Sequence, residues 1–219
     1  MLKNDYMKEV ENSLKIVKKE VDKSILDNEI NKAYELINKE FKALIGLDIT
    51  TINTLSFDTV KTIISRDNQY NAEKYIALGE LLILQGSVCE RCNNEVEKFF
   101  YYDKALMAFV EAYNEDKHLE NKYLIDSLET IDELKNYQLE DDVNKNIIRI
   151  YKLLDRFDAA EDVLYELING TDNKRDAFQF GIDFYNSLKD KSQEELALGN
   201  LPIDEVRDGI TQLQKMMCK

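Results

Sequence analysis

Two groups of side chains in this 219-residue sequence have the types and spacing to do chemistry. The first is Cys89 and Cys92, a Cys-x-x-Cys pair that could cycle between thiol and disulfide or supply half of a zinc site. A structural zinc site needs four ligands, and the remaining candidates are Cys218 and His118. The helix expected between the pair and His118 would hold them ~25 Å apart at about 1.5 Å per residue. We therefore expect no metal site. The alternative is that both cysteines are reduced thiols in a loop or at a helix end.

The second group is a set of three basic side chains, Lys145, Arg149 and Lys152. Their spacing of four and three residues places them on one face of a predicted helix. Three adjacent positive charges can recognise an anionic group such as a carboxylate. The alternative is an ordinary solvated helix face, paired with Asp141 and Asp142, which adds little to stability.

A catalytic mechanism has no support in the sequence. His118 is the only histidine, and its charged neighbours indicate an exposed turn between helices. There is no glycine-rich phosphate loop, calcium loop, zinc-protease helix or serine elbow. We therefore expect a protein that is not an enzyme and that carries no cofactor.

Charge and composition narrow the classes of partner and compartment. The formal net charge is −14, from 43 acidic and 29 basic side chains. Nucleic acids and anionic membranes need a basic surface, so we expect neither as a partner. The acidic surface favours partners that are basic. The charged start of the chain, the absence of a long apolar run and the odd number of cysteines predict a cytoplasmic protein.

Long helices are the predicted secondary structure. The sequence contains one proline, Pro202, and seven glycines, and the scarcity of both favours helices over short strands. Apolar side chains recur at steps of three and four residues, which is the helical period. On this pattern we expect helices over residues 3–24, 99–113, 119–134, 141–154, 158–168, 175–189 and 203–217. We also expect a second helix between Asp27 and Gly46, a short helix that begins at Ser56, and a helix from Asn71 to Leu84. Residues 47–55 are interpreted as a connection, and residues 86–98 as an interruption between two helices.

Large and small side chains alternate with the same rhythm in two stretches. Residues 72–117 carry this rhythm in Tyr75, Leu78, Gly79, Leu82, Ala105, Phe109 and Ala112. Residues 141–174 carry it in Ile147, Ile148, Tyr151, Phe157, Ala160, Leu164 and Leu167. Both stretches resemble the tetratricopeptide repeat family, which pairs two antiparallel helices in about 34 residues. Asn144 and Asp155 depart from the family pattern, because a large residue and a turn glycine are usual there.

The resemblance implies a helical solenoid whose concave face holds peptides or protein segments. The whole chain is also similar to an uncharacterised bacterial family of unknown function. That similarity is carried by the Asp5-Tyr6 start, by Ala-Glu-Asp-Val-Leu at 160–164 and by the tail that begins at Pro202. It implies no activity.

Together these patterns predict an all-α, tetratricopeptide-repeat-like right-handed α-solenoid of eight to nine helices. We expect a single domain over residues 1–219. It would consist of N-terminal helices (1–66), repeat-like helix pairs (71–174) and C-terminal capping helices (175–219).

The predicted function is a non-catalytic module that binds a peptide segment of a protein partner in a concave groove. Lys145, Arg149 and Lys152 would hold an acidic or C-terminal carboxylate. Three aromatic residues would frame the pocket or pack behind it, namely Tyr75, Tyr101 and Tyr102. The alternatives are a metal- or redox-responsive protein that uses the cysteine pair, and a structural protein whose apolar stripes are covered by a second copy.

Overall fold

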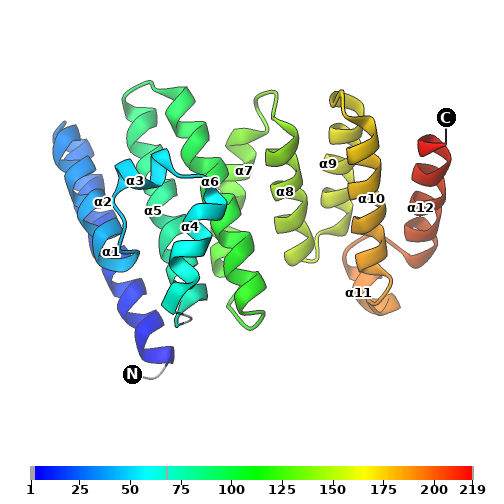
Figure 1. Cartoon of the computed structure of the whole chain (residues 1–219), viewed down its shortest axis with the longest axis horizontal. Coiled ribbons are helices and arrows are strands. Elements are labelled where there is room, and N and C mark those ends of the chain that lie inside the picture. Colours follow the sequence, from blue (N-terminus) through cyan, green and yellow to red (C-terminus); the bar gives the residue numbers. More distant parts are fainter. Residues whose placement is uncertain (1–2, 68, 219) are drawn as a thin grey trace. The chain divides into compact units, whose positions relative to one another are not determined.

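The computed structural model of the chain describes residues 3–67 and 69–218, and over these residues it contains helices and no strands (Figure 1). The predicted all-α class is confirmed. The described residues form twelve α-helices and a 3₁₀ turn, where the sequence predicts eight to nine helices. Two of the additional helices, α3 (Ile49–Thr54) and α11 (Gln193–Leu198), are six residues long. A segment of that length is too short to show a helical period, which is why residues 47–55 read as a connection.

The chain divides into two compact units, residues 1–134 and residues 135–219. The first contains α1 (Lys3–Leu26), α2 (Ile30–Leu44), α3, α4 (Phe57–Ile64), α5 (Asn71–Arg91), α6 (Glu95–Glu115) and α7 (Lys122–Leu134). The second contains α8 (Asp141–Leu153), α9 (Phe157–Gly170), α10 (Lys174–Leu188), α11 and α12 (Ile203–Met217). The boundary falls inside the 71–174 segment of predicted helix pairs, and the single domain stays a prediction.

The centre of the first unit is a helical hairpin of α5 and α6, each 21 residues long. The expected interruption over residues 86–98 is wrong, since only residues 92–94 separate the two helices. Gly86 lies inside α5, and a larger residue would not fit at this position because the Tyr102 ring occupies the space that a β-carbon would need. The same holds for Gly79, earlier in α5, where a β-carbon would lie 2.6 Å from Cε1 of Phe109. As the sequence predicts, a small residue lets the helices approach while an aromatic ring fills the seam.

Four helix ends in the described residues close with the same turn. At each, an asparagine or aspartate adopts a left-handed backbone conformation with φ between 53° and 59°: Asn28, Asn93, Asp155 and Asn200. At α8 the N–H of Arg156 donates to the carbonyl of Tyr151 at 2.9 Å, and that of Asp155 donates to Lys152 at 3.2 Å. These paired bonds satisfy carbonyls that the helix end leaves open. Asp155 therefore supplies the conformation for which the repeat family uses glycine.

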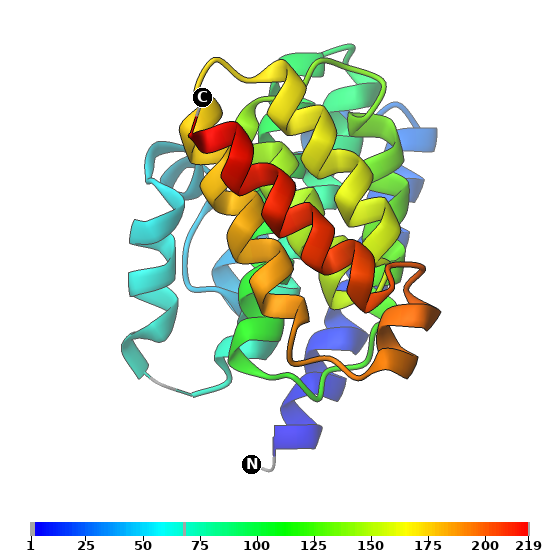
Figure 2. The same ribbon diagram turned by 90° about the vertical axis from the view of Figure 1, so that its right-hand side faces the viewer.

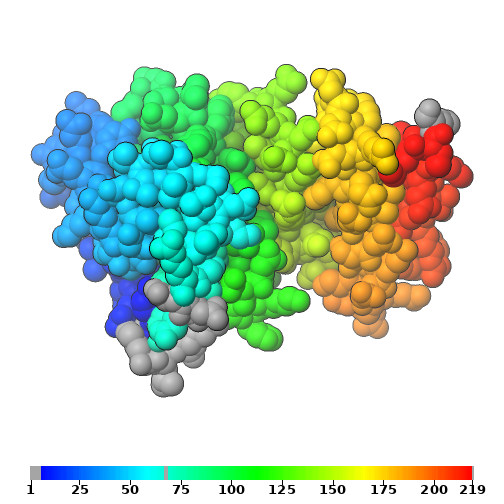
Figure 3. All heavy atoms as spheres, viewed as in Figure 1, coloured from blue at the N-terminus to red at the C-terminus, as the bar shows by residue number. Residues whose placement is uncertain are grey.

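Helices α3 and α4 cover one side of the α5–α6 hairpin, on the face seen in Figure 3. Lys104 of α6 is buried, and its ammonium donates to the carbonyls of Ile52 (2.6 Å) and Leu55 (3.1 Å). These carbonyls belong to the C-terminal end of α3, where a positive charge is favourable. The same end of α3 approaches Tyr101, whose hydroxyl accepts a bond from the Asn53 amide at 2.7 Å.

In the second unit, α8 and α9 form a hairpin across residues 154–156, and α12 packs against α10 (Figure 2). Gly209 of α12 lies against the ring of Tyr185, so the two helices meet closely. None of the described helices of either unit is both long and apolar enough to cross a membrane.

Candidate functional site

The three predicted basic side chains lie on the side of α8 that faces α10 in the second unit. Lys145 contacts Asp176 at 2.7 Å, and the Arg149 guanidinium lies 5.5 Å from the centre of the Phe180 ring. Lys152 donates to the hydroxyl of Ser187 at 3.3 Å. Each successive side chain of α8 thus meets a residue further along α10. The two helices therefore run parallel, and the contacts between them join residues 31 to 35 positions apart.

The three cations differ in how they are neutralised. Lys145 pairs with two carboxylates, Asp142 at 3.3 Å and Asp176 at 2.7 Å. Arg149 and Lys152 form no ion pair within 4.0 Å with any carboxylate that the structure describes. Arg149 donates to the side-chain oxygen of Asn146 at 2.8 Å, and Lys152 reaches only the Ser187 hydroxyl. These two residues are therefore the members of the predicted site that could meet a carboxylate from outside. We call Arg149 and Lys152 the cation pair.

Lys152 is held in an unfavourable electrostatic setting. Its side chain is half-buried, and the neighbouring charges are Arg149 and Lys191. Burial, together with repulsion from these two cations, lowers the pKa of Lys152 below its usual value. An anion placed beside Lys152 would relieve this repulsion.

The aromatic ring of Phe180 contacts Arg149, one member of the cation pair, and the neighbouring Lys145. The Arg149 guanidinium lies over this half-buried ring, and the Lys145 ammonium is 6.0 Å from the ring centre. Stacking on an aromatic face orients a guanidinium while leaving its N–H groups able to donate. Phe180 is a site residue that the sequence alone does not reveal. The sequence shows four aromatic residues in this helix, Phe178, Phe180, Phe184 and Tyr185, but not which of their rings faces α8.

The predicted aromatic contacts are not exposed. Tyr75, Tyr101 and Tyr102 are buried in the first unit, with at most 3% of each residue exposed. They belong to the core of that unit, and so they cannot serve as direct contacts to a partner. Residues 99–102 are four consecutive aromatic residues, and Phe100 is the exposed one. The ammonium of Lys104 lies 4.3 Å from the centre of the Phe100 ring. Four consecutive residues of a helix point in all directions around it. The sequence therefore predicts that some of these rings are buried, but not which ones.

The cysteine pair lies at the C-terminal end of α5. Cys89 is buried and Cys92 is exposed, and all three cysteines are free thiols. The hydroxyl of Tyr34 lies 3.7 Å from the Cys89 sulfur and 3.9 Å from the Cys92 sulfur. Burial, with Glu97 at 3.6 Å, raises the pKa of Cys89 to about 11, so its thiol is protonated at neutral pH. A protonated thiol is a poor nucleophile and a poor metal ligand.

Other groups that could bind a metal are not gathered together. Over the described residues, no three side chains from histidine, cysteine, aspartate and glutamate converge on a possible ion. His118 is exposed in the turn before α7, as the sequence predicts.

Comparison with known proteins places the chain in a family. The model of a family described as a family of unknown function, DUF6483, matches residues 1–218. The chain belongs to this family. Neither a curated protein nor a solved structure matches it. Membership of DUF6483 assigns no activity, so a function for the chain has to be argued from its own geometry.

Proposed function

We propose that this protein is a non-catalytic interaction module that binds a peptide segment of a partner protein along the face shared by α8 and α10. The observation that carries the proposal is the cation pair. Arg149 and Lys152 lie side by side on that face with no carboxylate partner among the described residues, in a chain whose acidic side chains outnumber its basic ones by 43 to 29. In such a chain, internal carboxylates are the commonest way to neutralise a cation.

The partner group that fits the cation pair is a single carboxylate. A guanidinium presents N–H donors in a planar fork that matches the two oxygens of a carboxylate, and the neighbouring ammonium adds a second positive charge. Four carboxylates border the pair, because Lys145 and Lys191 on its two sides carry their own acidic partners, namely Asp142, Asp176, Asp155 and Glu195. These negative charges would repel a polyanion such as a nucleic acid, while one carboxylate can be accommodated between them.

The arrangement of α8, α9 and α10 supports a tetratricopeptide-like scaffold for this binding. Helix α8 is the first helix of one pair, and α10 is the next helix that runs in the same direction. The two lie side by side, with contacts between residues 31 and 35 positions apart. The repeat period of the tetratricopeptide family, about 34 residues, lies within this interval. In that scaffold the face formed by successive first helices is the one that holds a peptide.

The proposal is tested with a short acidic peptide that ends in a free carboxylate. Fluorescence anisotropy would measure its affinity for the wild type and for the double variant Arg149→Gln, Lys152→Gln. We expect the variant to bind ~10-fold or more weakly, because two charge-assisted contacts are lost. An otherwise identical amidated peptide distinguishes a terminal carboxylate from an acidic side chain.

A matched control removes the same two residue types elsewhere in the second unit. Arg207 and Lys215 are exposed on α12, and the variant Arg207→Gln, Lys215→Gln has the same net charge as the test variant. It should bind the peptide like the wild type. Equal weakening by both variants would show a general charge effect, and the proposed site would be wrong. Circular dichroism confirms that each variant is folded.

A further inference from the structure

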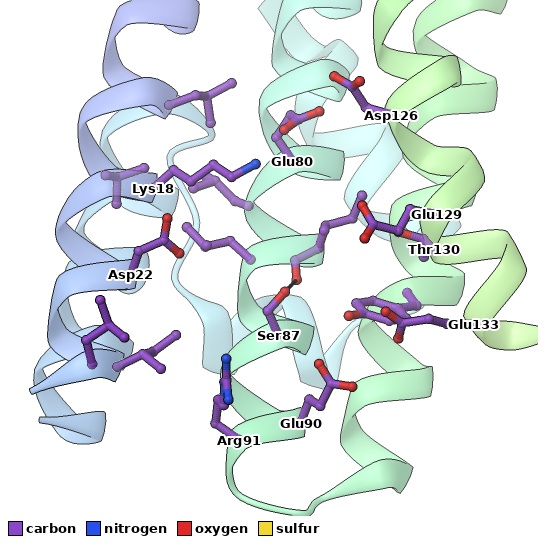
Figure 4. Close-up of a pocket in the computed structure, with 18 residues that line it drawn as sticks. Lys18, Asp22, Glu80, Ser87, Glu90, Arg91, Asp126, Glu129, Thr130 and Glu133 are labelled. Atoms are coloured by element: carbon purple, nitrogen blue, oxygen red, sulfur yellow. Dashed lines mark hydrogen bonds between the residues drawn. The ribbon is translucent and has the colours of Figure 1, made fainter. Parts of the chain in front are cut away.

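A groove lies in the first unit, far in sequence from the cation pair. Its floor is α5, and its walls are α1 on one side and α7 on the other (Figure 4). Its volume is 610 Å³. The side chains that line it come from residues 14–26, 80–91, 102 and 126–133, so the groove belongs wholly to the first unit.

The base of the groove is apolar. Ile83 of α5 and Leu14 and Ile25 of α1 contribute half-buried side chains to it, whereas Leu81, Leu84 and Val17, which also line it, are buried. At the end of α1, Leu26 lines the groove while 83% of the residue is exposed to solvent. Burying an exposed leucine side chain is favourable, so Leu26 can contact an apolar group of a partner.

The opposite wall is acidic. Asp126, Glu129 and Glu133 follow one another at steps of three and four residues on α7, which puts them on one face of that helix, and Figure 4 shows them on the groove side. Glu80 and Glu90 add two carboxylates from the floor. We call these five residues the acidic wall.

Lys18 and Arg91 also line the groove, but six carboxylates do so, and the positive charges near the acidic wall neutralise only some of it. Lys98 approaches Glu90 at 3.2 Å and Glu133 at 3.4 Å. Asp126 and Glu129 form no ion pair within 4.0 Å with the lysines and arginines that the structure describes. The groove therefore combines an apolar base with a one-sided excess of negative charge.

The length of the groove matches about three turns of a helix. Its floor extends along α5 from Glu80 to Arg91, which at about 1.5 Å per residue is ~16 Å, or about three helical turns. A guest helix lying along α5 would place one apolar stripe against Ile83, Ile25 and Leu26. Basic side chains on its flank would then face α7.

We propose that this groove docks a cationic amphipathic helix of a partner protein. Its apolar base and its acidic wall are each complementary to one face of such a helix. Helix-in-groove recognition uses apolar anchors at helical spacing, and the acidic wall selects lysine or arginine beside them. A wholly polar cation would leave the apolar base uncovered, and a nucleic acid would be repelled. This site is distinct from the one proposed on α8 and α10, and it takes a partner of opposite charge.

The test uses a short helical peptide with leucines on one face and lysines on the other. A peptide of the same composition in scrambled order removes the amphipathic pattern, and spermine supplies positive charge alone. We expect the amphipathic peptide to bind the wild type, and to bind the double variant Asp126→Asn, Glu129→Gln ~10-fold more weakly. The variant Leu26→Ser should also weaken binding of this peptide. Because Leu26 is exposed, that change leaves the fold intact.

The control variant is Asp162→Asn, Glu166→Gln, which removes two exposed carboxylates from α9 in the second unit. It should bind the amphipathic peptide like the wild type. The proposal is overturned if the wild type does not bind the peptide, if the scrambled peptide or spermine binds equally well, or if the α7 variant binds unchanged. None of these variants alters Arg149 or Lys152, so failure here leaves the acidic-peptide experiment unaffected.

Discussion

At the scale of single residues, Lys98 is the cation that pairs with three carboxylates at once. Only 5% of its side chain is exposed, and its ammonium lies within 3.4 Å of carboxylates at the end of α5, the start of α6 and the end of α7, namely Glu90, Glu95 and Glu133. Burial lowers the pKa of Lys98, but the contacts with Glu90 and Glu95 raise it by more, and the net shift is upward. Lys98 thus stabilises the folded chain below its ordinary pKa of 10.5.

We predict that Lys98→Met destabilises the protein by about 1–3 kcal/mol at pH 7, since three partly buried carboxylates would lose their common partner. Urea unfolding measures the change, and Lys39→Met, at an exposed position of α2, is the control. A variant as stable as the wild type at pH 7 would contradict this account of Lys98.

Glu80 belongs to the acidic wall and lies in the floor of the groove. Its charged form should destabilise the folded chain, whereas the charged form of Lys98 stabilises it. Burial raises the pKa of Glu80 above its ordinary value of 4.5, and Asp126 reinforces the shift against the opposing charge of Lys18. The folded state therefore holds a proton that the unfolded chain has released, and stability falls as pH rises from 4.5 through the raised pKa. We predict that Glu80→Gln is more stable than the wild type at pH 7 and equal to it near pH 4. Thermal unfolding at both pH values tests this, and equal stability at pH 7 would contradict it.

At the scale of elements, four of the described helix ends close with a turn that needs a residue in the left-handed conformation. Asn93, with φ of 54°, closes α5 and sets the hairpin with α6. An alanine in this conformation costs about 1–2 kcal/mol, whereas glycine adopts it freely. We predict that Asn93→Ala lowers the free energy of unfolding by about 1 kcal/mol and that Asn93→Gly does not lower it. Asn31→Ala, within α2, should cost nothing, and equal effects of alanine and glycine at position 93 would refute this explanation of the turn.

The sequence predicts the helical elements better than their contacts. The periodicity of apolar residues identifies the long helices, and the pairing of Gly79 with an aromatic ring follows from the alternation of large and small residues. Six-residue helices such as α3 are not predicted from this periodicity, because they span less than two turns. The spacing of Asp126, Glu129 and Glu133 is visible in the sequence, but that they face α1 across α5 depends on tertiary packing. For the same reason, the sequence places Lys145, Arg149 and Lys152 on one face without showing that Lys145 alone is neutralised.

At the scale of the whole molecule, both units are acidic, and the net charge of −14 is shared between them in rough proportion to their lengths. The cation pair in the second unit would hold a carboxylate, and the acidic wall in the first would hold basic side chains. Salt should weaken both interactions, because each depends on charges near the surface. In this account the cation pair receives a peptide carboxylate.

The most direct test is nuclear magnetic resonance of the side-chain N–H groups of arginine and lysine during titration with the acidic peptide. We predict saturable shifts of the Arg149 and Lys152 signals, while Arg207 and Lys215 on α12 stay unchanged. Signals of the cation pair that do not move, or that move no more than those of α12, would contradict the claim.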